Sequence, residues 1–462
     1  MLRYQTLQKI ALGVLVLCIP SCMSYYAKYQ KFNTNFEQGN LKEADAILAS
    51  DKKGPKGKAH LLYFLNRGTV NSYLGNYEES NEFFEQAYNI SEVQTNTAVE
   101  SGLSLLLNPK LAEYHGETFE VLLLNYYKAL NYLKLGKYDE ALVECKRMDI
   151  RLNKLTDKFS SDAKYKRDAF VHLLMGIIYD INQDYNNAFI AYRNALEIYE
   201  KDYTVKFDTP VPLQLKKDLL RTAYLTGLTD DVRTYENKFG MKYQNVSDKS
   251  KGEMLFLWHN GFGPVKEEWS IDFTIVDLGN GYINFVNLGA GLTIPIFIGN
   301  DNNQRAQLKD VQIIRMALPK YVERPPVFTS GYLTTPDGAS HPVELAENVN
   351  AIAFKALHDR FLRDLGTALL RLALKKAAEL ALRKENQDAG MVLGLFNAVS
   401  EQADTRNWQT LPYAIHYARV SVPAGESVVQ FKEKANQGSD QKIPITVNVK
   451  EGQTFVYTIS GQ

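Results

Sequence analysis

Gly136-Lys137-Tyr138-Asp139-Glu140-Ala141 is the stretch that decides the fold of the first half of this chain. A glycine can end a helix because it tolerates a left-handed backbone, and a small residue in the next turn lets the following helix lie close by. The tyrosine between them packs into the corner. The same phrase recurs, so the chain from about 25 to 240 is predicted to repeat a helix-turn-helix unit. The other copies are Gly39-Asn40-Leu41-Lys42-Glu43-Ala44, Gly75-Asn76-Tyr77-Glu78-Glu79-Ser80 and Gln183-Asp184-Tyr185-Asn186-Asn187-Ala188.

Helical spacing continues on both sides of these turns. Ala188, Tyr192 and Ala195 fall on one face of a helix. In the helices before the turns, Gly68 and Gly176 stand where the two helices of a pair would cross. Both positions therefore predict a close approach of paired helices.

These turns resemble those of tetratricopeptide repeats, which are helix pairs of about 34 residues that stack into a solenoid with a concave inner face. The spacing is longer around Asn108-Pro109 and at 156–163, where insertions are expected, and a weaker fifth pair is predicted at 213–239. The resemblance implies a TPR-like domain over 22–245 that binds peptides or proteins. A non-repetitive helical bundle is the alternative.

Past Lys251 the apolar residues alternate with period two, which predicts strands. Pro325-Pro326 interrupts regular pairing. The predicted fold class is α+β multidomain, in which the α-solenoid is followed by an antiparallel β-sandwich or barrel-like domain over 250–462. The predicted strands are 254–258, 282–286, 292–298, 311–319, 413–422, 427–432, 443–449 and 455–459.

A long helical insertion from about 342 to 403 is predicted to divide these strands and to lie across the sheet with a solvated basic side. The alternative is that the basic side meets a membrane face or an acidic partner. The apolar run 390–396 is shorter than the roughly 20 residues that span a bilayer. The apolar stripe is Phe354, Leu357, Phe361, Leu365, Leu369, Leu372 and Leu380, and the basic residues are Arg360, Arg363, Arg371, Lys375, Lys376 and Arg383.

The first 21 residues resemble a bacterial lipoprotein signal that ends before Cys22. Arg3 and Lys9 form a basic flank, 10–19 is apolar, and a small residue precedes the cysteine. The resemblance implies that Cys22 begins the mature protein and carries acyl chains such as palmitate. Met23-Ser24 follows without an aspartate, which favours the outer membrane, facing the periplasm. An ordinary secretory signal or a membrane anchor is the alternative.

The composition and the absence of certain motifs argue against several classes of function. Lys plus Arg and Asp plus Glu number 53 each, so no overall basic charge supports nucleic-acid binding. The seven histidines lack metal-ligand spacing, and no phosphate-binding glycine loop is present. We therefore expect no metal, no cofactor and no enzymatic activity, and we expect Cys145 to be a buried thiol on a helix.

Two local clusters are candidates for a partner or ligand surface. In the first, His259 and Glu267 could transfer a proton, although a tight exposed connection at Asn260-Gly261 and Gly263-Pro264 explains the same residues more simply. In the second, Asp404 could hold Arg406 while the nearby tryptophan packs into the sheet. The candidate surface residues are Trp258, His259, Asn260, Lys266, Asp404, Arg406 and Trp408.

A whole-chain resemblance rests on the same regions. Asp404-Thr405-Arg406-Asn407-Trp408-Gln409-Thr410-Leu411-Pro412, with 258–268, Ala317-Leu318-Pro319 and 418–425, is similar to a family of bacterial tetratricopeptide lipoproteins that carry an Asp-Thr-Arg-x-Trp-x-x-Leu-Pro motif. The family has no established activity, and the resemblance implies an envelope protein. We expect a lipid-anchored adaptor or regulator of cell-envelope assembly with envelope protein partners.

Two other functions stay open at this point. The chain has 28 tyrosines, and a tyrosine-rich surface on the solenoid resembles that of lipid-anchored, glycan-binding repeats of nutrient-uptake systems. A glycan- or peptidoglycan-binding lipoprotein is therefore the alternative. A hydrolase that uses His259 and Glu267 is the weaker alternative.

Overall fold

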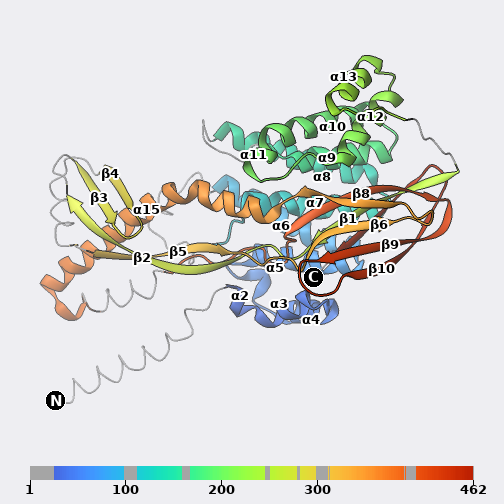
Figure 1. Ribbon diagram of the computed structural model, residues 1–462. Helices are drawn as coiled ribbons and strands as arrows, with labels where there is room; N and C mark the ends of the chain where they lie inside the picture. The colour runs from blue at the N-terminus through green and yellow to red at the C-terminus, as the bar shows by residue number, and fades with distance from the viewer. Residues whose placement is uncertain are drawn as a thin grey trace.

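Paired antiparallel helices form the first half of the chain in the computed structural model (Figure 1). The structure describes residues 25–97, 112–158, 167–244, 250–277, 281–297, 311, 313–389, 391 and 402–460. Cys22, Asn108-Pro109 and most of the predicted insertion at 156–163 lie outside these residues, as do the side chains of Arg360 and Arg363.

Five helix pairs are present in the described part of the chain, and they confirm the predicted TPR-like architecture, including its fifth pair. They are α3 (Gln30–Glu37) with α4 (Leu41–Ser50), α5 (His60–Leu74) with α6 (Tyr77–Thr97), α7 (Thr118–Lys134) with α8 (Tyr138–Lys158), α9 (Ala169–Ile181) with α10 (Tyr185–Ile198), and α12 (Leu213–Leu225) with α13 (Thr229–Phe239). Short helical turns lie between them at α2 (Tyr25–Lys28), η2 (Gly54–Lys56), η5 (Tyr199–Tyr203) and α11 (Thr204–Lys206).

The turns between paired helices have the predicted left-handed backbone. Gly39, Gly75 and Gly136 have φ of 75°, 84° and 69°. In the fourth copy Gln183 takes the same conformation, with φ of 60°, although a side chain at this φ costs free energy. The turn geometry therefore holds even where the glycine is missing.

The predicted close approaches at glycine are confirmed. A Cβ atom at Gly68 would lie 2.6 Å from the Phe84 ring, and one at Gly176 would lie 2.4 Å from the Tyr192 ring. In both pairs an aromatic side chain of the second helix fills the space that the missing side chain leaves in the first.

A seven-stranded sheet in the order β10-β9-β6-β7-β8-β1-β11 forms the barrel-like part of the second half. Contacts between β10 and β11 bring its two ends together, so the barrel is nearly closed. Among the described strands, β1 pairs with β11 in parallel and the other pairs are antiparallel. The strands are β1 (Lys251–Asn260), β6 (Phe328–Thr334), β7 (Ser340–Glu347), β8 (Ala414–Pro423), β9 (Gly425–Ala435), β10 (Gln441–Val449) and β11 (Thr454–Ser460).

A separate antiparallel sheet has the order β4-β3-β2-β5. Its strands are β2 (Val265–Asp277), β3 (Tyr282–Asn287), β4 (Leu292–Phe297) and β5 (Ile313–Val322). The predicted β-rich domain thus consists of a nearly closed barrel-like sheet and a second antiparallel sheet, and β2, β6 and β7 were not predicted. Glu267 and Glu268 hid the start of β2, because a polar pair after glycine and proline is typical of a turn.

Helix α15 (Val349–Glu385) joins the helical half to this smaller sheet (Figure 1). Its 37 residues give a length of about 55 Å at ~1.5 Å per residue. Ile352 and Ala353 pack in the same core as the helix pairs, and Leu365, Leu369 and other later residues pack on the four-stranded sheet. The helix begins at Val349 and not near 342, because 340–347 forms β7 and Val343 packs inside the barrel.

No helix in the described ranges is both long and apolar enough to cross a membrane, and this includes α15.

Adding a methyl group at Gly176 tests the predicted close approach. Gly176→Ala should lower the free energy of unfolding by about 1–3 kcal/mol, because the buried Tyr192 ring must move. Gly366→Ala is the matched control: a Cβ there meets no atom within 4 Å, so this helix substitution should be neutral or stabilising by up to about 1 kcal/mol. Urea denaturation measures both, and equal effects would contradict the packing argument.

Candidate functional site: the seam between the helix pairs and the barrel

Strand β1 carries three of the predicted site residues on alternating faces. Trp258 points into the barrel core, and its neighbour His259 points to the helix pairs. Asn260 is also buried and donates a hydrogen bond from Nδ2 to the Phe328 carbonyl oxygen at 2.9 Å. The predicted exposed connection at Asn260-Gly261 is therefore wrong: both residues are buried, and Gly261 lies against Pro326 and Tyr413.

His259 is held between tyrosines of the helix pairs. Its Nδ1 lies 3.0 Å from the Tyr73 hydroxyl and its Nε2 lies 2.6 Å from the Tyr126 hydroxyl. The Tyr73 hydroxyl also lies 3.0 Å from that of Tyr127. Burial, with a smaller contribution from the cation of Lys134, lowers the pKa of His259 to about 3. The imidazole is therefore neutral at physiological pH.

The proposed acid-base pair of His259 and Glu267 does not form. His259 is 1% exposed and both ring nitrogens have tyrosine partners. The Glu267 side chain is 51% exposed and lies 3.9 Å from Lys320 Nζ. Because His259 and Glu267 lie on strands of different sheets and have other partners, the weaker hydrolase hypothesis loses its geometric basis.

Residues 402–412 form an irregular segment that contacts both the helix pairs and β2. Asp404 binds Arg406 at 2.7 Å, as predicted. Arg406 also donates from Nη1 to the carbonyl oxygens of Lys58 and Ala112, each at 3.0 Å. The local ion pair thus presents the guanidinium to the helical half.

Trp408 is the centre of this segment, and it is 1% exposed. Its backbone N–H donates to Glu120 Oε1 at 2.7 Å, and its indole N–H donates to Thr410 Oγ1 at 2.8 Å. Its ring lies against Phe84 and Tyr127, with centroids 6.0 and 5.7 Å away. The prediction that Trp408 packs into the sheet is wrong, because these aromatic neighbours belong to α6 and α7.

Lys266 completes the same contact from the side of β2. Its buried ammonium group forms an ion pair with Glu117, and its backbone N–H donates to Asn407 Oδ1 at 3.2 Å. Burial, together with the nearby Glu117 carboxylate, raises the pKa of Glu120. A buried ion pair of this kind is costly to break, since one partner would remain as an uncompensated charge.

A second contact, which the sequence did not indicate, lies at the other end of the seam. Arg419 of β8 is buried and reaches Asp180 of α9 at 2.8 Å, Asp218 of α12 at 3.4 Å and Glu253 of β1 at 2.8 Å. Tyr199 adds a hydrogen bond to the Ala346 carbonyl oxygen at 2.6 Å. The one available signal was a charged side chain, Arg419, within the mostly apolar strand 414–423.

Six of the seven predicted surface residues are buried. Asp404 is the exception, with 22% of its side chain exposed. These residues do not form an open surface for a partner. Trp258 and Asn260 make their contacts within the barrel. The other buried residues contact the helical half of the chain. The buried ones are Trp258, His259, Asn260, Lys266, Arg406 and Trp408.

A pocket of about 100 Å³ opens beside this seam. Aromatic and polar side chains of α3, α5 and β1 line it. His259, Tyr73 and Thr410 contribute to its wall, but their polar atoms already have the partners described above or, for Thr410, Asn66. The pocket is therefore a gap between packed elements with few unused hydrogen-bonding groups. Its other lining residues include Phe36, Phe262 and Ser460.

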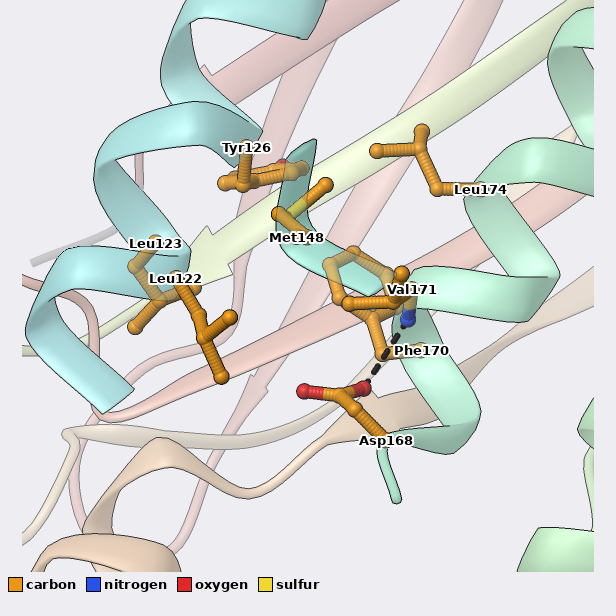
Figure 2. Close-up of a pocket in the computed structure, with 8 residues that line it drawn as sticks. All are labelled: Leu122, Leu123, Tyr126, Met148, Asp168, Phe170, Val171 and Leu174. Atoms are coloured by element: carbon orange, nitrogen blue, oxygen red, sulfur yellow. Dashed lines mark hydrogen bonds between the residues drawn. The ribbon is translucent and has the colours of Figure 1, made fainter. Parts of the chain in front are cut away.

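A smaller cavity lies between α7, α8 and α9 (Figure 2). Its volume is about 10 Å³, which is close to the minimum for one water molecule. The walls are apolar except at Asp168, which caps α9 by accepting a hydrogen bond from the Val171 N–H at 2.9 Å (Figure 2). The cavity reflects imperfect helix packing and offers no room for a ligand.

Metal ligands and a reactive thiol are the other kinds of site to consider in the part of the chain that the structure describes. No group of three or more His, Cys, Asp or Glu side chains could hold a metal ion there. Cys145 is fully buried, and burial raises the pKa of its thiol. The expectation of a buried thiol is confirmed.

Comparison with known proteins finds a likeness in structure alone. No family model and no curated protein matches the sequence. The structure is similar to the apo form of RapI at 17% identity and a TM-score of 0.34, over 51% of this chain and 57% of that one. It is also similar to MamA of Desulfovibrio magneticus RS-1 at 15% identity and a TM-score of 0.28, over 46% of this chain and 88% of that one.

A third similar structure is a kinesin light chain protein of Podospora anserina with nearly identical TPR-like repeats. The identity is 16% and the TM-score 0.31, over 46% of this chain and 91% of that one. This chain spans little more than half the length of RapI. At these scores the likeness carries no argument about function, and the TPR-like fold rests on the helix pairs themselves.

Removing the Trp408 ring tests the seam as a structural junction. Trp408→Ala should lower the free energy of unfolding by about 3–5 kcal/mol, because a large cavity opens between α6, α7 and the 402–412 segment. Amide hydrogen exchange should rise in both α7 and β1. Trp269→Ala, in the four-stranded sheet, is the control and should leave exchange in α7 unchanged; unaltered exchange in Trp408→Ala would contradict the assignment.

The protonation of His259 gives a second test. The folded-state pKa lies below the unfolded value of about 6.5, so its contribution to stability is present above that pH and is lost as the pH falls toward 3. Imidazole ¹⁵N resonances should show one histidine that stays neutral down to about pH 4 and is missing in His259→Gln. A His259 resonance that titrates near pH 6.5 would contradict the buried neutral state.

Proposed function

We propose that this protein is a lipid-anchored adaptor or regulator in assembly of the bacterial cell envelope, held at the outer membrane and facing the periplasm. The observation that carries the protein-binding part is the array of TPR-like helix pairs from α3 to α13. Stacked helix pairs offer extended surfaces that commonly bind peptides or proteins. The anchor rests on the sequence before Cys22, and the similarity to bacterial lipoproteins supports the compartment.

The partner would bind away from the seam. The barrel and the 402–412 segment cover residues of α5, α7 and α9, which are first helices of their pairs. The second helices retain exposed apolar side chains: Val143 and Ile150 of α8 are 48% and 54% exposed. They stand seven residues apart, so they share one face of the helix. This face of α8 is the place where we expect a partner to contact the helix pairs.

The glycan-binding alternative has lost its main support. Stacking on a sugar needs an exposed aromatic face, and Trp258 and Trp408 are both fully buried. Several tyrosines of the helix pairs, such as Tyr126, Tyr127 and Tyr192, are buried as well. No specific observation favours this alternative over a protein partner.

The anchor is tested by Cys22→Ser. The substitution should abolish labelling by radioactive palmitate and move the protein from the membrane fraction to the soluble fraction, while its thermal unfolding stays unchanged. The control is Cys145→Ser, which should keep both the label and the membrane location. Persistent labelling of Cys22→Ser would contradict lipidation at this residue.

The adaptor role is tested by site-specific crosslinking in cells. A photo-crosslinking amino acid at Val143 should capture a reproducible protein on α8, whereas one at Val428, which is 46% exposed on the barrel, is the control for non-specific capture. If Val143 and Ile150 capture no protein above that control, the proposed contact surface is wrong.

A further inference from the structure

The barrel interior contains an acidic side chain that has no ion-pair partner among the described residues. Glu433 of β9 is 1% exposed, and its Oε1 atom has no hydrogen-bond partner. It lies opposite Gly331 of β6 and Gln441 of β10, which are both uncharged. A carboxylate buried in this way is strongly disfavoured, because its loss of hydration is not compensated by a cation on either neighbouring strand position.

Trp258 reaches Glu433 from across the barrel. Strands β1 and β9 are not neighbours in the sheet, yet Trp258 lies 5.4 Å from Phe431 between ring centroids. A Cβ atom at Gly331 would lie 3.1 Å from the Trp258 ring, so the ring rests on the strand next to Glu433. The buried indole N–H of Trp258 also has no hydrogen-bond partner in the described structure, and it lies close enough to Glu433 to act on the pKa of that carboxyl.

The other titratable groups near Glu433 leave its charge uncompensated. His416 of β8 lies 4.8 Å from Trp258 between ring centroids, and burial lowers its pKa to about 4, so it is neutral near pH 7. Lys432 and Lys434 flank Glu433 on β9 but face the other side of the strand. Lys432 binds Asp440 at 3.0 Å, and Lys434 lies over the Tyr332 ring.

We propose that Glu433 is a pH-sensitive element of the barrel, whose protonated carboxyl permits tight packing across Trp258 and whose ionisation weakens that packing. The proton passes to solvent, so no other reactant is required. The physical basis is the loss of hydration on burial, which raises the pKa of Glu433 to about 7. The change would therefore occur near neutral pH.

The position of Trp258 gives this element a route to the helix pairs. The next residue, His259, faces the opposite side of β1 and is bound by Tyr73 and Tyr126. Strand β1 therefore contacts both the barrel core and the helix pairs. Weaker packing of β1 inside the barrel would also weaken its contacts with the helix pairs. The outcome would be a looser seam at alkaline pH and a tighter one below neutral pH.

The sign of the pH dependence follows from the raised pKa. The stabilising contribution of protonated Glu433 is fully present below its unfolded pKa of about 4.5 and is lost as the pH rises to about 7. Other residues, such as His416, change stability in the opposite direction at acid pH. The test must therefore compare the protein with a variant that differs only at Glu433.

Glu433→Gln keeps the size of the side chain and removes its charge. Urea unfolding at several pH values between 4.5 and 8.5 gives the unfolding constants of the two proteins. The ratio of wild-type to variant constants should rise by up to about tenfold per pH unit between about 4.5 and 7 and then level off. Glu426→Gln, at an exposed position of the same strand, is the control and should show no such rise.

A second measurement does not depend on the stability of the variant. The indole ¹H–¹⁵N resonance of Trp258, assigned by its absence in Trp258→Phe, should shift with a midpoint near pH 7 in the wild-type protein. A constant unfolding ratio from pH 5 to 8, or an indole resonance unchanged over that range, would overturn the proposal.

Discussion

Strand β1 contributes side chains to two hydrophobic cores at once, and the rest of the structure depends on this constraint. Met254, Phe256 and Trp258 pack inside the barrel, whereas Leu255 and Leu257 pack in the core shared with the helix pairs. Because side chains alternate across a strand, every position from Met254 to Asn260 is buried. The strand therefore behaves as a shared wall, and neither half of the protein presents a complete surface without the other.

The segment at 402–412 shows that part of a TPR-like array can be covered by its own chain. Stacked helix pairs commonly bind peptides or proteins, and here an irregular part of the same chain is bound by Glu120, Asn66 and the aromatic rings around Trp408. Arg406 and Lys266 add charged contacts on either side. The Asp404 to Pro412 motif, which the sequence offered as a candidate partner or ligand surface, thus joins parts of the same chain.

Buried charge is distributed unevenly along this junction. Arg419 meets carboxylates from both halves of the protein, and Lys266 meets Glu117, so these charges are compensated. Glu433 has no such partner. A buried ion pair fixes the arrangement of the elements that supply it, whereas a lone carboxyl makes its surroundings depend on protonation. The ion pairs therefore fix the junction, whereas the packing inside the barrel depends on pH through Glu433.

Local sequence determined the helix pairs, most strands, the glycine crossings and the Asp404–Arg406 pair, because each depends on residues a few positions apart. It placed the turns at Gly39, Gly75 and Gly136 for the same reason. The sequence missed β2, β6 and β7, in the case of β2 because charged residues masked its alternation, and it could not divide the strands between two sheets. Only the tertiary structure decided that His259 and Trp408 are buried, because their partners Tyr126 and Tyr127 are more than a hundred residues away along the chain and approach them only when the barrel docks on the helix pairs.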